Sequence, residues 1–146
     1  ADLRAVRAAL RPNTALLWTE SPSNPLIKIS DVAALADIAH AQGARLLVDA
    51  TFATPILLRP IELGADLVLH STTKYFGGHS DVLGGALVLS DAETQRNGAR
   101  FSELRKLTGA SPSPFNSWLI LRGIRSLPCR VHQQSRNASA LASFLS

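Results

Sequence analysis

The sequence predicts an α/β fold in which a mostly parallel sheet is flanked by helices. Its short apolar runs are continuous rather than alternating, a pattern typical of strands that are buried on both faces. Within residues 1–91 these runs alternate with segments of helical periodicity, as in a parallel sheet with crossover helices. Polar clusters follow three of the runs, at Glu20–Asn24, Asp49–Thr51 and His70–Lys74, and parallel sheets bind ligands beyond the carboxyl ends of their strands.

Each element follows from a local pattern. Strands are expected at four apolar runs: Ala15–Thr19, Arg45–Val48, Asp66–Leu69 and Ala86–Leu89. Helices are expected where apolar residues have helical spacing: Asp2–Leu10, from Ser30 or Asp31 to about Gln42, Pro60–Leu63, and about 92–107, 114–126 and 129–145. Ser30 or Asp31 can cap the second helix, and Gly43 ends it. We expect Trp18, Trp118 and Cys129 in the core.

The charge of the chain changes near residue 91. Residues 1–91 hold 7 Lys and Arg against 9 Asp and Glu, a balance of −2, whereas residues 92–146 hold 8 against 2, a balance of +6. The chain of 146 residues is long enough for one domain with a core, so we expect an α/β ligand-binding part over about 1–91 and a helical part over about 92–146. The basic residues lie on helical segments without interleaved aromatic side chains, which argues against a nucleic-acid partner.

The composition also indicates the cellular compartment of the protein. The apolar runs are far too short to cross a bilayer, and the first ten residues lack the apolar stretch of a signal peptide, so we expect no membrane partner. A single cysteine excludes an internal disulfide and fits a reducing compartment. The sequence therefore predicts a cytoplasmic protein.

The segment from Leu67 to Gly85 carries the strongest chemical signal. An apolar strand leads into Ser71-Thr72-Thr73-Lys74, and a glycine-rich loop follows. Hydroxyls and backbone N–H groups suit a phosphate, and a lysine beside them can condense with an aldehyde. We expect Lys74 to be buried, so that its amine acts as a base near neutral pH. Taken alone, most lysines in such a position are surface residues.

Asp49 ends a strand whose other residues are mostly apolar. Carboxylates are rarely buried without a partner, so Asp49 is either a capping or salt-bridged residue, or the partner of a bound cation. A protonated pyridine ring is one such cation, and an aspartate that keeps it protonated makes the ring an electron sink.

Two other readings of the loop are less favoured. His70, His79 and Asp81 lie close in sequence, but their spacing matches no established metal-ligand pattern, so no metal site is expected. The Gly77-Gly78 and Gly84-Gly85 pairs lack the residues that follow in a P-loop and the context of a dinucleotide fingerprint. Turn geometry is their simpler role.

Taken together, these blocks resemble the transsulfuration family, the Cys/Met-metabolism enzymes that depend on pyridoxal phosphate (PLP), with most similarity to the cystathionine γ-synthases and lyases. The resemblance rests on Glu20-Ser21-Pro22-Ser23-Asn24-Pro25, Val48-Asp49-Ala50-Thr51-Phe52-Ala53-Thr54-Pro55, Ser71-Thr72-Thr73-Lys74-Tyr75 with its glycine loop, and Ser113-Pro114-Phe115-Asn116-Ser117 with Leu121-Arg122-Gly123. It covers nearly the whole chain and implies the large domain of a fold-type-I PLP-dependent transferase, in incomplete form.

The resemblance also implies roles for individual residues. Lys74 would form the covalent link to PLP and serve as the catalytic base. Asp49 would pair with the pyridine nitrogen, and Ser71 and Thr73 would hold the cofactor phosphate. Asn24 would lie near the phenolic oxygen of PLP and the substrate carboxylate, and Thr51 near the ring. Ala50, where many members have Asn, leaves Asp49 in place.

The family implies a β- or γ-elimination, or a γ-replacement, on cystathionine, homoserine esters or related amino acids, in a homotetramer built from dimers. The family's N-terminal arm, phosphate loop, ring-stacking tyrosine and C-terminal domain are not found in these 146 residues. Two alternatives therefore stay open: a catalytically incomplete remnant of such an enzyme, and a nucleotide-binding α/β module.

Overall fold

The computed structural model describes residues 2–146, which form two compact units. The sheet unit runs up to His70 and resumes over Gly85–Ser111, and the lysine unit comprises Ser71–Gly84 with Pro112–Ser146. In chain order the elements are α1 (Leu3–Ala9), β1 (Leu16–Glu20), α2 (Val32–Ala41), β2 (Arg45–Asp49), α3 (Thr54–Leu57), the 3-10 helix η1 (Pro60–Leu63), β3 (Leu67–Ser71), β4 (Gly85–Leu89), α4 (Asp91–Leu107), α5 (Pro114–Arg125) and α6 (Leu127–Leu145).

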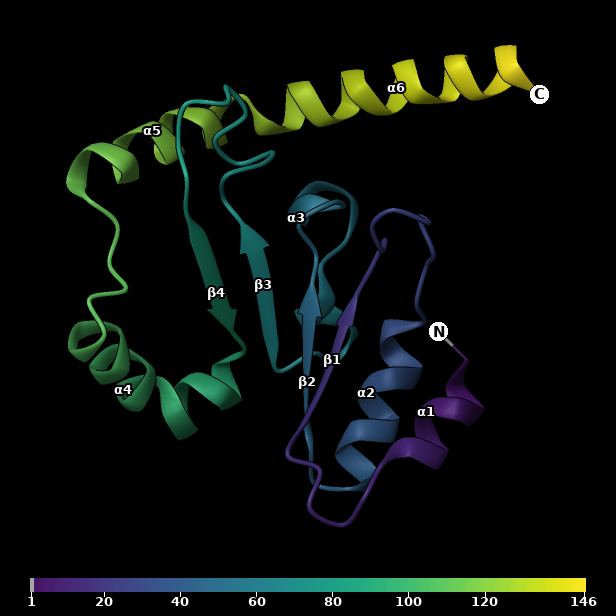
Figure 1. Ribbon diagram of the computed structural model, residues 1–146, viewed down its shortest axis with the longest axis vertical. Coiled ribbons are helices and arrows are strands. Elements are labelled where there is room, and N and C mark those ends of the chain that lie inside the picture. The colour runs from purple at the N-terminus through teal and green to yellow at the C-terminus, as the bar shows by residue number, and fades with distance from the viewer. Residues whose placement is uncertain (1) are drawn as a thin grey trace. The chain divides into compact units, whose positions relative to one another are not determined.

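The four strands form one sheet in the order β1-β2-β3-β4. Strands β1, β2 and β3 are parallel, with Glu20 opposite Asp49 and Asp49 opposite Leu69. The arrow of β4 points the opposite way from that of β3 (Figure 1), so the fourth strand returns antiparallel. The expected α/β architecture with a mostly parallel sheet is confirmed, and the carboxyl ends of β1, β2 and β3 lie at one edge.

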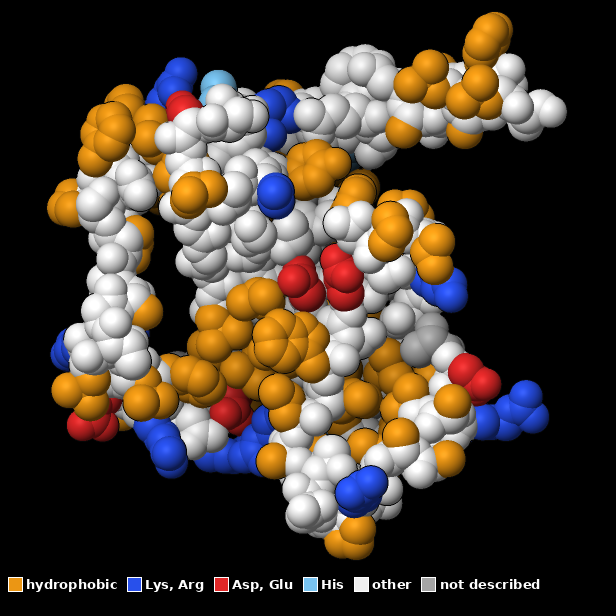
Figure 2. All heavy atoms as spheres, viewed as in Figure 1, with side chains coloured by type: hydrophobic (Ala, Val, Ile, Leu, Met, Phe, Trp, Pro, Cys, Tyr) orange, Lys and Arg blue, Asp and Glu red, His pale blue; other side chains and the backbone are white. Residues whose placement is uncertain are grey.

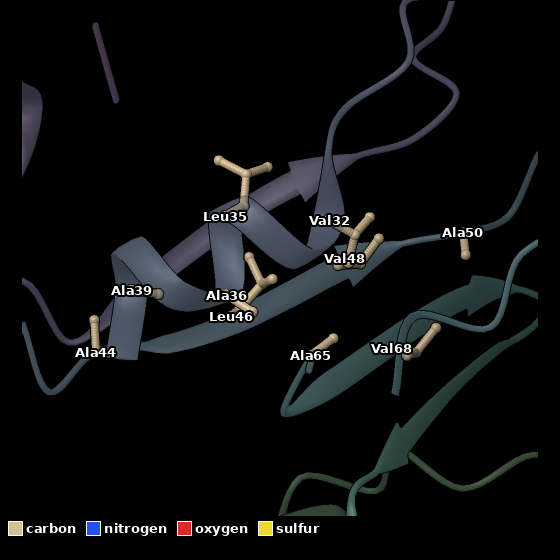
Figure 3. Close-up of a cluster of buried hydrophobic side chains, with 10 residues drawn as sticks. All are labelled: Val32, Leu35, Ala36, Ala39, Ala44, Leu46, Val48, Ala50, Ala65 and Val68. Atoms are coloured by element: carbon tan, nitrogen blue, oxygen red, sulfur yellow. The ribbon is translucent and has the colours of Figure 1, made fainter. Parts of the chain in front are cut away.

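The core of the sheet unit lies between α2 and the sheet. Val32, Leu35, Ala36 and Ala39 recur with helical spacing, so one stripe of α2 meets the buried face of β2 (Figure 3). Their partners include Leu46, Val48 and Val68 from the strands. Complete burial of a side chain such as Leu35 contributes about 2 kcal/mol. This packing fixes β2, and with it the position of the residues that follow the strand.

The ends of α2 are set by the residues that the sequence indicated. The Asp31 carboxylate accepts a hydrogen bond from Ala34 N at 3.0 Å, as an N-cap does. Gly43, which follows the helix, has φ +71°, a conformation that favours glycine. Gly64 closes η1 in the same way, with φ +95°. The short helix α3, which follows Ala53, was not expected from the sequence.

Polar groups tie the outer elements to the sheet. The Glu93 side chain in the first turn of α4 is only 3% exposed, and its carboxylate accepts hydrogen bonds from Arg45 Nε at 3.2 Å, Arg96 Nη1 at 3.3 Å and Asn97 Nδ2 at 2.6 Å. Because Arg45 begins β2, this carboxylate joins α4 to the sheet. On the same unit, Asp66 Oδ2 accepts from Leu46 N and contacts His40 Nε2, both at 2.8 Å.

The prediction that the first strand is buried is wrong. β1 is an edge strand, and Trp18, which we expected in the core, is 59% exposed. Hydrophobic side chains gather over the strands on the face of the sheet turned to the viewer (Figure 2). Leu16, Leu87 and Val88 are further apolar strand residues with exposed side chains. The exposed apolar side chains thus belong to the edge strands β1 and β4, whereas Leu46, Leu47 and Val48 of the central strand β2 are all buried.

The lysine unit contains the loop from Ser71 to Gly84 and the helices α5 and α6. Ser113 caps α5 by accepting a hydrogen bond from Asn116 N at 3.1 Å, and Pro114 begins that helix. The break expected between residues 126 and 129 lies at Ser126, and Pro128 itself stands in the first turn of α6, where its missing N–H has no intrahelical partner to lose. Trp118 is 56% exposed and Cys129 is exposed, so the expectation that both lie in the core is wrong.

No helix within residues 2–146 combines the length and the apolar character that a bilayer crossing requires.

Candidate active site

In the sheet unit, the candidate residues cluster around the end of β2. Asp49 is half-buried, and its Oδ1 accepts a hydrogen bond from Thr51 N at 2.9 Å. Its backbone carbonyl accepts from Ser21 N at 3.1 Å, which ties the loop after β1 to the end of β2. The structure therefore brings Asp49 and Thr51 together and attaches the Glu20–Pro25 loop beside them. An aspartate placed this way can accept a hydrogen bond from an N–H or O–H group of a ligand at the sheet edge.

Asn24 is exposed within that loop. Its backbone N donates to Glu20 Oε2 at 3.3 Å. The loop is folded on itself by two serines: Ser21 is buried and its hydroxyl accepts from Ser30 N at 3.1 Å, while Ser23 Oγ accepts from Lys28 N at 3.2 Å. Asn24 is thus held on an ordered loop that starts at the same strand edge as Asp49.

His70, treated from the sequence as a loop residue, is instead a strand residue with 5% exposure. Burial lowers the pKa of its imidazole below the ordinary value of 6.5, and the charge of Asp49 and a backbone hydrogen bond with Ala50 oppose that shift. The imidazole is therefore neutral near pH 7 and lies within the electrostatic reach of the Asp49 carboxylate. The continuity of the apolar run Leu67–Leu69 into His70 was the available signal for this burial.

In the lysine unit, Lys74 lies in a hydrogen-bonded turn that begins where β3 ends. Its backbone N donates to Ser71 O at 3.2 Å, and its carbonyl accepts from Gly78 N at 2.8 Å. Gly77 N closes the turn by donating to Thr72 O at 2.8 Å. The Lys74 side chain is exposed, so the expectation that it is buried is wrong for this chain. The backbone that carries the amine is fixed, while the amine itself is accessible.

A groove of about 630 Å³ lies beside the lysine. It is lined by residues of the lysine unit alone: Thr73, Lys74, Tyr75, Gly78, Ser80, Asp81, Val82, Leu83, Arg130 and Gln134. Its volume suits a small organic ligand. Cationic, acidic and hydroxyl side chains all border it, so a polar ligand could find several partners there.

The two hydroxyl residues predicted to bind phosphate have different surroundings. Ser71 ends β3 and is half-buried. The Thr73 hydroxyl accepts a hydrogen bond from Gly84 N at 3.0 Å and donates to Gly84 O at 3.2 Å, so it joins the two ends of the glycine-rich loop. Thr72, between them, is buried, and its hydroxyl has no hydrogen-bond partner among residues 2–146.

Arg130 and Gly123 are two residues of this unit that the sequence did not single out as functional. The Arg130 guanidinium donates to Tyr75 O at 2.8 Å, immediately after Lys74, and Gly123 approaches the backbone of Phe76 and Gly77. Gly123 lies within the family-like segment Leu121-Arg122-Gly123. Arg130 had no signal beyond its charge, because only the tertiary structure shows which basic side chains turn inward.

The donor set fits PLP. An accessible primary amine suits an aldehyde, the hydroxyls and turn backbone beside it suit a phosphate, and the carboxylate at the end of β2 suits a protonated ring nitrogen. The amine and hydroxyl groups belong to the lysine unit, and the carboxylate belongs to the sheet unit. Among residues 2–146, no group of three or more His, Cys, Asp or Glu side chains is placed to hold a metal ion.

Comparison with known proteins agrees with this chemistry. The sequence model of the family described as "Cys/Met metabolism PLP-dependent enzyme" matches residues 1–146. A probable cystathionine γ-synthase of Herpetosiphon aurantiacus is 51% identical over 145 residues, which are 99% of this chain and 44% of the relative. The cystathionine γ-synthase of Mycobacterium bovis is also 51% identical, over 99% of this chain and 37% of its own length.

The fold is shared with solved structures as well. The crystal structure of cystathionine γ-lyase from Lactobacillus plantarum complexed with L-serine matches with a TM-score of 0.94 at 40% identity, over 99% of this chain and 37% of that one. The chain thus spans less than half the length of these relatives. The match of the family model over residues 1–146 shows that this chain belongs to the Cys/Met-metabolism family of PLP-dependent enzymes.

Proposed function

We propose that the full-length protein is a transsulfuration enzyme that carries out β- or γ-elimination, or γ-replacement, on cystathionine, homoserine esters or related amino acids. The observation that carries the proposal is Lys74: an accessible amine on a fixed turn, beside hydroxyls and a groove, in a PLP-dependent family. Identity of 51% to two cystathionine γ-synthases favours γ-replacement, while the 40% identity to a γ-lyase keeps elimination as the second candidate.

Lys74 would act twice. Its Nζ would link to the cofactor aldehyde, and after an amino-acid substrate displaces it, the freed amine would accept the proton from the substrate α-carbon. PLP, when bound, supplies an electron sink for the charge that develops there. Both steps would use a lysine whose backbone is held by hydrogen bonds with Ser71 and Gly78.

Asp49 would hold a proton on the cofactor ring by accepting its N–H hydrogen bond. One of its oxygens already accepts from Thr51 N, which orients the carboxylate. His70 lies buried close by, and because burial lowers its pKa it adds no positive charge that would compete for Asp49 near pH 7. Thr51, whose backbone N–H orients Asp49, would also contact the ring. Asn24 would reach the substrate from its loop.

Ser71 and Thr73 would donate hydrogen bonds from their hydroxyls to the cofactor phosphate. The Thr73 O–H points to Gly84 O, so it would turn from that carbonyl to the phosphate while still accepting from Gly84 N. Such a switch exchanges a neutral hydrogen bond for a charge-assisted one, which is about twice as strong.

We also propose that the enzyme is cytoplasmic and forms a homotetramer, on the basis of the single cysteine within these 146 residues and of its family. Its substrates would be small amino acids rather than nucleic acid or membrane lipid.

An assay of the full-length protein tests the proposed reaction. A homoserine ester supplied with cysteine should give cystathionine through γ-replacement, and supplied alone it should give a 2-keto acid and ammonia through elimination. The Lys74→Ala variant should lose both activities by more than about 1,000-fold, since it removes the nucleophile and the base together. Lys106→Ala, at the exposed end of α4, is the matched control and should keep them. A Lys74→Ala enzyme with wild-type turnover would refute the proposal.

A further inference from the structure

The Arg130 side chain is bound by the backbone that follows Lys74. Its Nη2 donates to Tyr75 O and to Gly123 O, both at 2.8 Å, and its Nε donates to Ser126 Oγ at 3.0 Å. All of these residues belong to the lysine unit. One guanidinium thereby joins the turn after Lys74 to the end of α5. An arginine is suited to this role because its planar group has five donors in a fixed geometry.

The position of Gly123 explains why a cation is favoured there. Gly123 lies in the last turn of α5, at the negative end of the helix dipole, and its carbonyl also accepts hydrogen bonds from Ser126 N and Ser126 Oγ, both at 3.2 Å. Hydrogen bonds from a charged donor to such carbonyls are stronger than neutral ones. Arg130 lies in the first turn of α6 and donates back to this carbonyl. The same guanidinium therefore links α5 to α6 and holds the turn that follows Lys74.

Two glycines show how closely the parts fit. A Cβ on Gly123 would collide with the carbonyl oxygens of Phe76 and Gly77, so α5 lies directly against the backbone of the turn. A Cβ on Gly78 would collide with the Arg130 guanidinium, and Gly78 has φ +71°. The turn is therefore confined by α5 on one side and by the guanidinium on the other.

These contacts reach Lys74 through one peptide unit. The Lys74 carbonyl accepts from Gly78 N, and the next carbonyl along the chain, that of Tyr75, accepts from Arg130. Lys74 and Arg130 also line the same groove. A rotation of the Tyr75 peptide would turn the Lys74 Cα–Cβ bond, and the long side chain would amplify that change at Nζ.

We infer that Arg130 is a positioning residue for Lys74: its bonds to Tyr75 and Gly123 hold the turn so that Nζ meets the aldehyde carbon of the cofactor. The inference rests on the proposed role of Lys74. Its chemical consequence falls on one step, in which Nζ bonds to the aldehyde carbon and the aldehyde oxygen leaves as water. Noncovalent binding of the cofactor depends on the phosphate and ring contacts and should depend little on Arg130.

Two ligands separate these effects in the full-length apoprotein. Pyridoxamine phosphate has an amine in place of the aldehyde and cannot bond to Lys74, so its Kd reports noncovalent binding alone. The rate of covalent capture of PLP is followed by quenching with borohydride, which reduces the new C=N bond, and by measuring the label on the Lys74 peptide. Arg130→Ala should slow capture by about 10- to 100-fold, since misplacement of a reacting group by about 1 Å has an effect of that size. Its Kd for pyridoxamine phosphate should stay within about threefold.

Matched variants complete the test. Arg136→Ala, on the same helix with its guanidinium bonded to Gln133, should leave both quantities unchanged. Arg130→Lys keeps the charge but not the fork of donors and should be slowed as well, and added guanidinium should restore part of the rate to Arg130→Ala. If Arg130→Ala does not fold, Arg130→Lys is judged by the same two measurements.

Several results would overturn the inference. One is capture at the wild-type rate in the folded Arg130 variants. Another is a parallel loss of capture and of pyridoxamine phosphate binding, which would make Arg130 a general support of the fold. If the wild-type protein itself carries no label on Lys74, the proposed function fails first, and that result is distinct from both.

Discussion

Thr73 and Gly84 exchange a pair of hydrogen bonds: the threonine hydroxyl accepts from Gly84 N at 3.0 Å and donates to Gly84 O at 3.2 Å. Its neighbour Thr72 is buried with a hydroxyl that has no hydrogen-bond partner in residues 2–146. The two adjacent threonines are therefore expected to affect the stability of the loop that carries Lys74 in opposite directions.

Substitution of each threonine by valine should separate these contributions. Thr72→Val removes an unsatisfied buried hydroxyl at nearly constant volume and should raise the free energy of unfolding by about 1 kcal/mol. Thr73→Val leaves the Gly84 N–H without its acceptor and should lower the free energy of unfolding by about 1–2 kcal/mol. Urea denaturation of the apoprotein measures both. Equal effects of the two substitutions would contradict the hydrogen bonding described for this loop.

A pair of helical glycines offers a second contrast. Gly123→Ala would drive a methyl group into the carbonyls of Phe76 and Gly77 and should cost about 2 kcal/mol or more. Gly98→Ala in α4 would place its methyl 3.4 Å from Thr94 Cγ2, an ordinary contact, and should stabilise the helix by about 0.5–1 kcal/mol. Thermal unfolding of the two variants should move in opposite directions. A harmless Gly123→Ala would show that α5 does not lie against the turn.

Glu93 should be the most important carboxylate of α4 for stability. Glu93→Ala leaves Arg45 and Arg96 without their common acceptor, and because those side chains are 30% and 52% exposed, solvent reduces the loss to about 2 kcal/mol. Glu103→Ala, on the exposed part of the same helix, should change the free energy of unfolding by less than about 0.5 kcal/mol. The comparison is made by urea denaturation. A Glu93→Ala protein as stable as Glu103→Ala would contradict the burial of this ion-pair cluster.

His70 should make stability depend on pH. Burial lowers its folded-state pKa below the unfolded value of 6.5, so the unfolded chain binds the proton more readily and is favoured as the pH falls. The contribution of His70 is present above pH 6.5 and is lost as the pH drops below it, with a slope of at most about 1.4 kcal/mol per pH unit. In His70→Gln this part of the slope should vanish. An identical pH slope in the two proteins would contradict the shift.

The sequence predicted the elements of the fold well wherever local rules govern them. Asp31 begins and Gly43 ends a helix, as expected, because caps and left-handed positions act within a few residues. Trp18 was misplaced because an apolar run looks the same in a central strand and in an edge strand, and only the pairing of strands decides which is exposed. Cys129 was misplaced because helical spacing does not say which face is covered.

In the candidate site, too, residues marked by a local pattern could be predicted, and residues placed by tertiary contacts could not. Lys74, Ser71 and Thr73 could be found because they are contiguous and follow a strand, and Asp49 because a carboxylate ends an apolar run. Arg130 could not be found, since 55 residues separate it from Tyr75 and nothing in its neighbours marks it as an inward-turning side chain. The burial of His70 was missed because the strand continues two residues beyond its apolar pattern, to Ser71.

The central claim is that Lys74 is the residue that bonds to PLP, and hydride trapping tests it most directly. The full-length protein, loaded with PLP, is reduced with borohydride, digested and analysed by mass spectrometry. The cofactor mass should appear on the peptide that contains Lys74 and on no peptide that contains another lysine, including Lys28 and Lys106 of these 146 residues. A cofactor-loaded protein whose label lies on another residue, or that carries no label after reduction, would contradict the account.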